Sequence, residues 1–307
     1  MYANELSRWV GDVEKFKTRH WRRQPAVFDS FLDAPTTIDD LDAALSSGLL
    51  RTPHIEMMKN GDRVDVALYT TSREVMGQSH AGFADHERVL GLLRDGATLL
   101  LRNTEQWHRP TADLVSRISQ ELGRRVEAFV FATPPGAQGL ALHRDDADVL
   151  LLQVAGSKHW TVKGGPVSGD WNAGEVSEDA GPVLLETTVS PGQVLYIPRG
   201  YAHAAIGNQG LSLHLSLTIR EVGTRQLVRT LQHLLVSELR LPVRPLDDES
   251  LATVAATLIS TIRERATQLS PEDLLASARE AQGHQHLTGH GRPEIAAYAA
   301  ALLSSGG

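Results

Sequence analysis

The sequence has no cysteine among its 307 residues. A disulfide scaffold, a thiolate zinc site, an iron–sulfur cluster and a cysteine nucleophile are therefore all excluded. Any metal site must be built from histidine, aspartate or glutamate. The 13 histidines are a generous supply of such ligands.

Long apolar runs and an excess of positive charge are also missing. No apolar stretch approaches the roughly 18 residues that cross a bilayer, and the N-terminal segment carries charges where a secretory signal would be apolar. We therefore expect a cytoplasmic protein without a membrane partner. The formal net charge of −7 gives no general attraction to phosphate backbones, so direct nucleic-acid binding is not expected. The same acidic balance would suit a basic protein or peptide as substrate.

Three regions with different periodicities follow one another along the chain. Residues 1–95 have apolar positions at helical spacing, and within them Asn60-Gly61 favours a tight hairpin turn. Residues 96–220 contain many short runs of Val, Leu, Ile and aromatic residues, separated by Gly, Pro, Asn and Asp. Residues 221–307 return to helical spacing and are rich in leucine. The chain should therefore have a β-rich centre between two helical regions.

The predicted fold class is mainly β with flanking helices. Many short strands with Gly/Pro turns favour a jelly roll over a parallel α/β sheet, and the glycine motifs of nucleotide-binding folds are missing. We expect one domain over residues 1–220, with its barrel core at about 96–220, and a helical region over 221–307. The leucines of this last region fit either packing on the barrel or a dimer interface. The histidine-containing stretch 283–291 is expected to be a solvated Gly-rich loop rather than a metal site.

One segment combines residues that can bind a metal ion. His143 and Asp145 are two positions apart, so on a strand both side chains project from the same face. A third ligand is available in His203, just after a strand that ends at Pro198 and a turn at Gly200. Two imidazoles and one carboxylate occupy one face of an octahedral ion, which is typical of non-haem Fe(II) oxygenases. The open positions of such an ion can accept a 2-oxo acid and dioxygen.

A 2-oxo acid also needs a cation for its far carboxylate. Lys158 lies on the predicted strand that follows the turn at Gly156, and it could make this charge-assisted bond. The alternative is that Lys158 is an ordinary surface lysine. His214 is a polar residue among leucines, and we assign it with Lys158 to cofactor binding, the alternative being a core histidine with satisfied hydrogen bonds. His159 should point to the opposite face and be structural. Asp148 is expected to be a polar rim residue.

The stretch from Phe131 to Lys163, together with GQVLYIPRGYAH, resembles the JmjC/cupin-type 2-oxoglutarate oxygenases. Within them it is similar to the ribosomal-oxygenase branch, which hydroxylates protein side chains, over about residues 15–220. The resemblance implies a double-stranded β-helix and a homodimer formed by the helices after the barrel. The residues that match the Fe(II) ligands of the family are His143, Asp145 and His203, and the residue that matches its 2-oxoglutarate anchor is Lys158.

The chain also departs from this branch. Members often have Asn and Tyr where this sequence has Phe129 and Phe131, which leaves the substrate open. We expect an Fe(II)/2-oxoglutarate-dependent dioxygenase that hydroxylates a side chain of a protein or peptide, with succinate and CO2 as coproducts. One alternative is the same chemistry on a free amino acid or small metabolite. Another is a metal-binding cupin without oxygenase activity that serves as a sensor or assembly factor.

Overall fold

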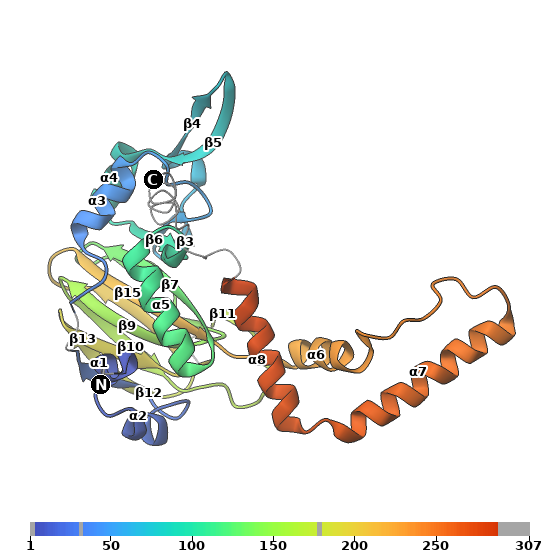
Figure 1. Ribbon diagram of the computed structural model, residues 1–307. Coiled ribbons are helices and arrows are strands. Elements are labelled where there is room, and N and C mark those ends of the chain that lie inside the picture. The colour runs from blue at the N-terminus through green and yellow to red at the C-terminus, as the bar shows by residue number, and fades with distance from the viewer. Residues whose placement is uncertain (1–3, 31–32, 177–179, 288–307) are drawn as a thin grey trace, which may run out of the picture. The chain divides into compact units, whose positions relative to one another are not determined.

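The structure, a computed structural model, describes residues 4–30, 33–176 and 180–287. The chain divides into two units, Met1–Glu221 and Val222–Gly307. The first unit is built around two antiparallel sheets with helices against the larger one (Figure 1). The second unit is helical.

The two sheets form the jelly roll that the sequence predicts. The larger sheet has the order β1-β13-β9-β15-β7-β6-β2-β3, and the smaller has the order β11-β8-β14-β10-β12. The strands of the larger sheet are β1 (Ala26–Asp29), β2 (Ile55–Lys59), β3 (Asp62–Arg63), β6 (Thr98–Arg102), β7 (Arg125–Thr133), β9 (Asp148–Ala155), β13 (Gln193–Ile197) and β15 (Ser212–Arg220). Those of the smaller sheet are β8 (His143–Arg144), β10 (Lys158–Lys163), β11 (Gly174–Glu175), β12 (Val183–Val189) and β14 (Ala202–Gly207).

Strand β15 shows how the larger sheet serves two purposes. Successive side chains on a strand point to opposite faces. Leu213, Leu215 and Leu217 join the main hydrophobic core, whereas His214 and Ser216 line a cavity between the sheets. One face of the sheet therefore supplies the core, and the other supplies the wall of a site.

Helices cover the core face of the larger sheet. Trp9, Phe16, Leu45 and Ile118 are buried in one cluster with strand residues such as Leu99. A capping box precedes Ile38, because the Thr37 side chain accepts from the Asp40 backbone N–H and the Asp40 carboxylate accepts from the Thr37 N–H. The helices of this unit are α1 (Glu5–Val10), α2 (Val13–Arg19), α3 (Ile38–Ser46), α4 (His86–Arg94) and α5 (Arg109–Leu122), with short 3-10 turns η1 (Val66–Leu68) and η2 (Thr104–Gln106).

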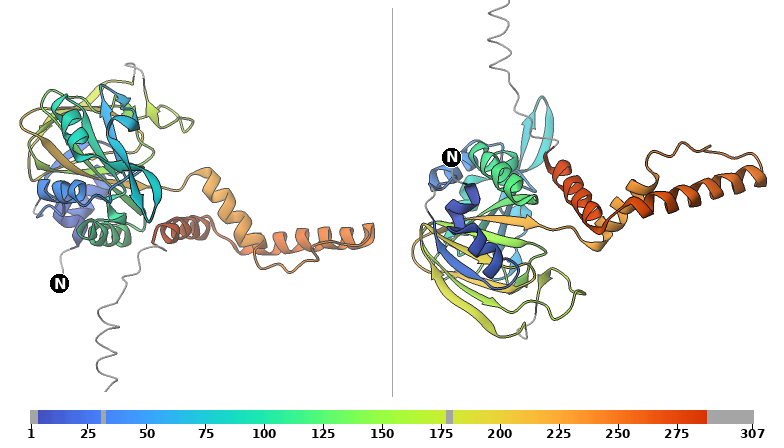
Figure 2. Two further views of the ribbon diagram at one scale, coloured as in Figure 1. Left: turned by 90° about the horizontal axis from the view of Figure 1, so that it is seen from above. Right: turned by 60° about the horizontal axis from the view of Figure 1, so that its bottom comes forward.

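Two hairpins lie before the barrel core. The predicted turn at Asn60-Gly61 is confirmed, since both residues have positive φ, 53° and 95°, and connect β2 to β3. The second hairpin, β4 (Thr70–Val75) and β5 (Gln78–Ala84), forms a separate two-stranded sheet that extends away from the barrel (Figure 1 and Figure 2).

The second unit contains α6 (Thr224–Val236), α7 (Asp248–Gln268) and α8 (Pro271–Leu287). Helix α6 contacts both α7 and α8. The loop predicted over 283–291 is wrong for residues 283–287, which continue α8, because a helix that has already formed tolerates one glycine at a cost of about 1 kcal/mol. Residues 288–291 lie outside the described part. Among the described helices, none is both long and apolar enough to cross a membrane.

Candidate metal centre and its cavity

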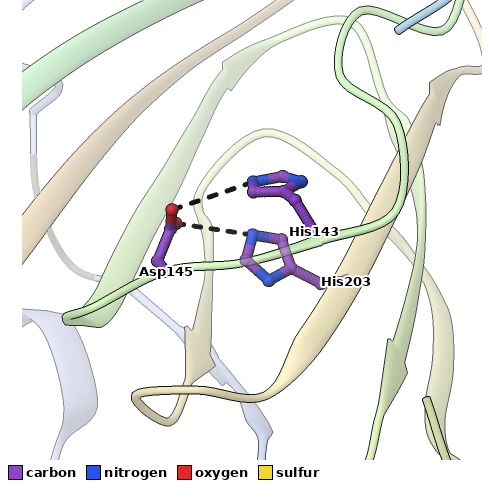
Figure 3. A group of neighbouring side chains, drawn as sticks. All are labelled: His143, Asp145 and His203. Carbon is purple, nitrogen blue, oxygen red and sulfur yellow. Dashed lines mark ion pairs between the residues drawn. The ribbon is translucent and has the colours of Figure 1, made fainter. Parts of the chain in front are cut away.

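Two short strands bring the three predicted ligands together. His143 on β8 pairs directly with His203 on β14, and their ring centroids are 4.3 Å apart. Asp145 follows β8, and its carboxylate faces both imidazoles (Figure 3). The distance from Asp145 Oδ1 to His143 Nε2 is 3.9 Å, and that from Oδ2 to His203 Nε2 is 3.6 Å. One ligand atom from each residue lies within 4.8 Å of the other two, so a single ion can contact all three.

Backbone carbonyls fix the orientation of both imidazoles. His143 Nδ1 is 2.8 Å from the Ala141 carbonyl oxygen, and His203 Nδ1 is 3.0 Å from that of Tyr201. A carbonyl only accepts, so each Nδ1 carries the proton and each Nε2 is left with its lone pair. Burial, followed by the neighbouring His143, lowers the pKa of His203 to about 4. His203 is therefore neutral near pH 7, as a metal ligand must be. This donor set fits a divalent ion such as Fe(II).

Lys158 lies in the same cavity and is almost completely buried. Its Nζ donates to Thr133 Oγ1 at 2.9 Å and lies 5.8 Å and 5.5 Å from the ring centroids of Phe131 and Trp160. Burial lowers the pKa of Lys158 to about 7. The contacts that the structure describes for this ammonium include no carboxylate. A buried cation in this state is suited to an anionic ligand.

His214 lies beside Lys158, buried and facing the cavity. Its ring stacks on Phe131 with centroids 4.8 Å apart and meets Trp160 edge-on at 5.5 Å. Burial, and then the nearby Lys158, keeps the pKa of His214 well below its usual value. Among the described residues, neither His214 Nδ1 nor Trp160 Nε1 has a hydrogen-bond partner, although both atoms are buried. Buried polar atoms of this kind normally have partners, and an oxygen-rich ligand next to Lys158 would supply them.

The cavity has a volume of about 360 Å³ and takes its walls from both sheets. The strand register places Phe131 opposite His214 and Phe129 opposite Ser216 on the inner face. Phe129 and Phe131 therefore face the cavity, where the resemblance anticipated Asn and Tyr. His159 points outward to Thr188 and Glu186, as predicted.

Asp148 is not a rim residue, contrary to the prediction. Its side chain is fully buried and accepts from the Tyr196 hydroxyl at 2.7 Å, from Arg22 Nε at 3.1 Å and from the Arg199 backbone N–H at 3.2 Å. A carboxylate can be buried when charged and polar groups compensate its lost hydration. Asp148 thus links the start of β9 to the loop before His203.

Sequence reasoning missed Arg144, which lies between two of the ligands. Arg144 Nη1 donates to the carbonyl of Gly200 and, at 3.0 Å, to that of Gly164. These bonds tie β8 to the turn that precedes His203. Its position between His143 and Asp145 was the only signal in the sequence. Backbone carbonyls are present at every residue, so the sequence does not show which of them Arg144 would contact.

Comparison with known proteins finds a family to which the barrel is similar. Residues 101–227 match the family model of the JmjC domain. Ribosomal oxygenase 1 of Gallus gallus is 30% identical over 217 residues, which is 66% of this chain and 34% of that protein. The bifunctional lysine-specific demethylase and histidyl-hydroxylase NO66 of Culex quinquefasciatus is 29% identical over 219 residues, 67% of this chain and 32% of that protein. The chain thus spans about a third of the length of these curated relatives.

Solved structures agree with the fold. The X-ray structure of Escherichia coli YcfD is similar with a TM-score of 0.56 at 19% identity, covering 87% of this chain and 70% of that one. The structure of YcfD, a ribosomal oxygenase from Escherichia coli, in complex with cobalt and 2-oxoglutarate has a TM-score of 0.53 at 18% identity and covers 86% and 69% of the two chains. At these identities the likeness concerns the fold alone.

Proposed function

We propose that the chain is a JmjC-domain protein of the ribosomal-oxygenase branch, and that it is an Fe(II)/2-oxoglutarate-dependent dioxygenase that hydroxylates a side chain of a protein or peptide. One observation carries the proposal: a His/Asp/His donor set and a buried lysine without a described carboxylate partner share one cavity. The relatives named as ribosomal oxygenase and histidyl-hydroxylase support a protein substrate.

Each residue has a defined task in this proposal. His143 and His203 would hold Fe(II) through Nε2, with Asp145 as the third ligand. Lys158 would bind the far carboxylate of 2-oxoglutarate, and the unpartnered His214 Nδ1 supports a role for this residue in the same pocket. When bound, iron and 2-oxoglutarate activate dioxygen to oxidise a C–H bond, with succinate and CO2 as coproducts.

The cavity walls contribute by excluding water and shaping access. Phe131 and Trp160 form apolar surface beside Lys158, which strengthens an ion pair made there because water is excluded. Phe129 and Ser216 lie one row further along the strands, towards the end of β15. A substrate side chain would contact Phe129 and Ser216, while Phe131 and His214, beside Lys158, would line the pocket for 2-oxoglutarate.

The proposal includes a homodimer formed through the C-terminal helices and a cytoplasmic location. Support for the dimer comes from α7, where large apolar side chains are exposed: 56% of Leu251, 51% of Ile259 and 36% of Ile262. Apolar side chains along one helix are typical of a surface that another chain covers.

Succinate formation tests the enzymatic part. The protein is supplied with Fe(II), 2-oxoglutarate and oxygen, with and without cell extract as a source of substrate. We expect turnover by the wild type and by His159→Ala, whose imidazole points out of the barrel, and a loss of at least about 100-fold in His143→Ala. Equal turnover by His143→Ala, or none by the wild type with extract, would contradict the proposal.

A further inference from the structure

Three arginines of the larger sheet line the cavity. Thr133, the hydrogen-bond partner of Lys158, pairs with Ser212 at the start of β15, whereas Arg220 is the last residue of that strand. Arg102 ends β6 and lies with its guanidinium 5.9 Å from the ring centroid of Phe129. With Arg63 on β3 these residues form what we call the arginine rim, which is Arg63, Arg102 and Arg220.

The carboxylates beside the rim are too few to neutralise it. Glu56 pairs with both Arg63, at 2.9 Å, and Arg102, at 2.5 Å. Glu127 pairs with both Arg220, at 2.9 Å, and Arg125, at 2.6 Å. Four guanidiniums thus share two carboxylates, which leaves a surplus of two positive charges.

Asp62 and Asp65 lie close to Arg63 in sequence, but in the contacts that the structure describes neither forms an ion pair with it. The Asp146 carboxylate is paired with Arg199, and Arg220 reaches only the Asp146 carbonyl. Among the described residues that line the cavity, Asp145 is the only carboxylate. With Fe(II) and doubly charged 2-oxoglutarate bound, the charges of the metal, the oxoacid, Asp145 and protonated Lys158 would sum to zero. The positive surplus at the rim therefore remains for the substrate.

The rim guanidiniums also keep donors for a ligand. Each has five N–H donors in a fixed fork. Arg63 uses Nε, Arg102 uses Nε and Nη2 on the same Glu56 oxygen, and Arg220 uses Nε and Nη1 in the contacts that the structure describes. Planar guanidiniums with spare donors match the geometry of a carboxylate.

We infer that the arginine rim binds a carboxylate of the substrate peptide, supplied by an acidic residue that flanks the hydroxylated position. The inference rests on the proposed function in taking a peptide as the substrate. It reverses the expectation of a basic substrate, which came from the net charge of −7. The overall charge describes the whole surface, whereas recognition depends on the potential at the cavity mouth.

Binding of peptide probes to the metal-free protein tests the inference without any catalysis. Three sets of short fluorescein-labelled, C-amidated peptides share a randomised central residue, which is flanked by Glu, Gln or Lys. We expect the Glu set to bind about fivefold more tightly than the Gln set, and the Lys set most weakly, with the difference shrinking as salt is raised. A Gln set with a free C-terminus separates a terminal carboxylate from a side-chain carboxylate.

Two rim variants should change this preference while remaining folded. In Arg63→Glu the Glu56 carboxylate keeps Arg102, and in Arg220→Gln the Glu127 carboxylate keeps Arg125, so neither glutamate of the native protein loses both of its partners. The Arg63 side chain is 73% exposed, which makes its replacement the safer one. We expect Arg63→Glu to lose the preference for Glu peptides and Arg220→Gln to reduce it. The control Arg19→Glu, on the exposed side of α2, should bind as the wild type does.

The outcomes separate this inference from the proposed function. Equal binding of the three sets by the wild type, or tighter binding of the Lys set, overturns the rim assignment even if succinate is formed. Rim-dependent binding of a single-stranded RNA oligonucleotide without any peptide preference also overturns it. If the protein prefers Glu peptides through the arginine rim but forms no succinate, the assignment of the rim is supported and the proposed dioxygenase activity is rejected. Thermal denaturation of each variant checks that folding is unchanged.

Discussion

Lys158 is placed at a cost to the stability of the protein. A buried ammonium without a counterion is less favourable than an apolar side chain of similar length. Burial lowers the pKa of Lys158 from its ordinary value of 10.5 to about 7 in the folded protein. Between these two values the unfolded chain binds more protons, so Lys158 makes stability rise with pH across this window. Below pH 7 the full penalty applies to the folded state.

Replacement of Lys158 should therefore stabilise the protein and impair its site. We expect Lys158→Met to increase the free energy of unfolding by about 1–2 kcal/mol at pH 6, with a smaller gain at pH 9. Thr133 keeps a partner in this variant, because Thr98 Oγ1 donates to it at 3.2 Å. The affinity for 2-oxoglutarate should fall by about 1.5–3 kcal/mol. Urea denaturation at the two pH values and calorimetric titration of 2-oxoglutarate measure the two effects.

The control for this variant is Lys15→Met, which replaces an exposed lysine on α2. Neither stability nor 2-oxoglutarate affinity should change by more than about 0.5 kcal/mol in the control. A destabilised Lys158→Met with unchanged 2-oxoglutarate affinity would show that the lysine is structural and that another residue anchors the oxoacid.

At the scale of elements, the turn between β9 and β10 determines where Lys158 lies. Gly156 has a φ of 57°, and a Cβ at this position would lie 2.5 Å from the Leu211 carbonyl oxygen. Gly123, which ends α5, has nearly the same φ of 58° but nothing within 4 Å of such a Cβ. The two glycines share the same backbone strain and differ only in the space around them.

This pair separates backbone strain from steric clash. Gly123→Ala should cost about 1 kcal/mol, the price of a left-handed conformation for an L-residue. Gly156→Ala should cost about 3 kcal/mol, because the backbone of residue 211 must also move. Chemical denaturation of both variants gives the comparison. Similar costs would mean that the β9–β10 turn shifts freely and does not fix Lys158.

At the scale of the whole molecule, the homodimer is the main prediction. Light scattering should give twice the chain mass of 33.4 kDa for the wild type. Leu251→Glu combined with Ile262→Glu should give the monomer mass, because two charges would be buried in an apolar interface. Glu264→Lys, an exposed position on the opposite side of the same helix, should leave the dimer intact. A monomeric wild type would contradict the assignment of the C-terminal helices.

Much of the fold could be predicted from local patterns. The hairpin at Asn60-Gly61, the capping box at Thr37 and the helix end at Gly123 each depend on neighbouring residues, so their signals lie within a few positions of sequence. The strand register that turns Phe129 and Phe131 towards the cavity could not be predicted, because a shift of one residue would place both side chains on the opposite face of the sheet. Asp148 was misjudged because its three partners lie 48 or more residues away in the chain.

The sequence alone determined which chemistry is available. Without cysteine, and with His143, Asp145 and His203 at strand spacing and after a turn, an oxygen and nitrogen donor set was the remaining choice. The tertiary structure alone decided the surroundings of that set. It buried Lys158 away from any described carboxylate, turned His214 towards it, and gathered four arginines around two glutamates on an acidic chain. The reason is physical: net charge and composition are sums over the chain, whereas pKa values and local potential depend on distances that only folding sets.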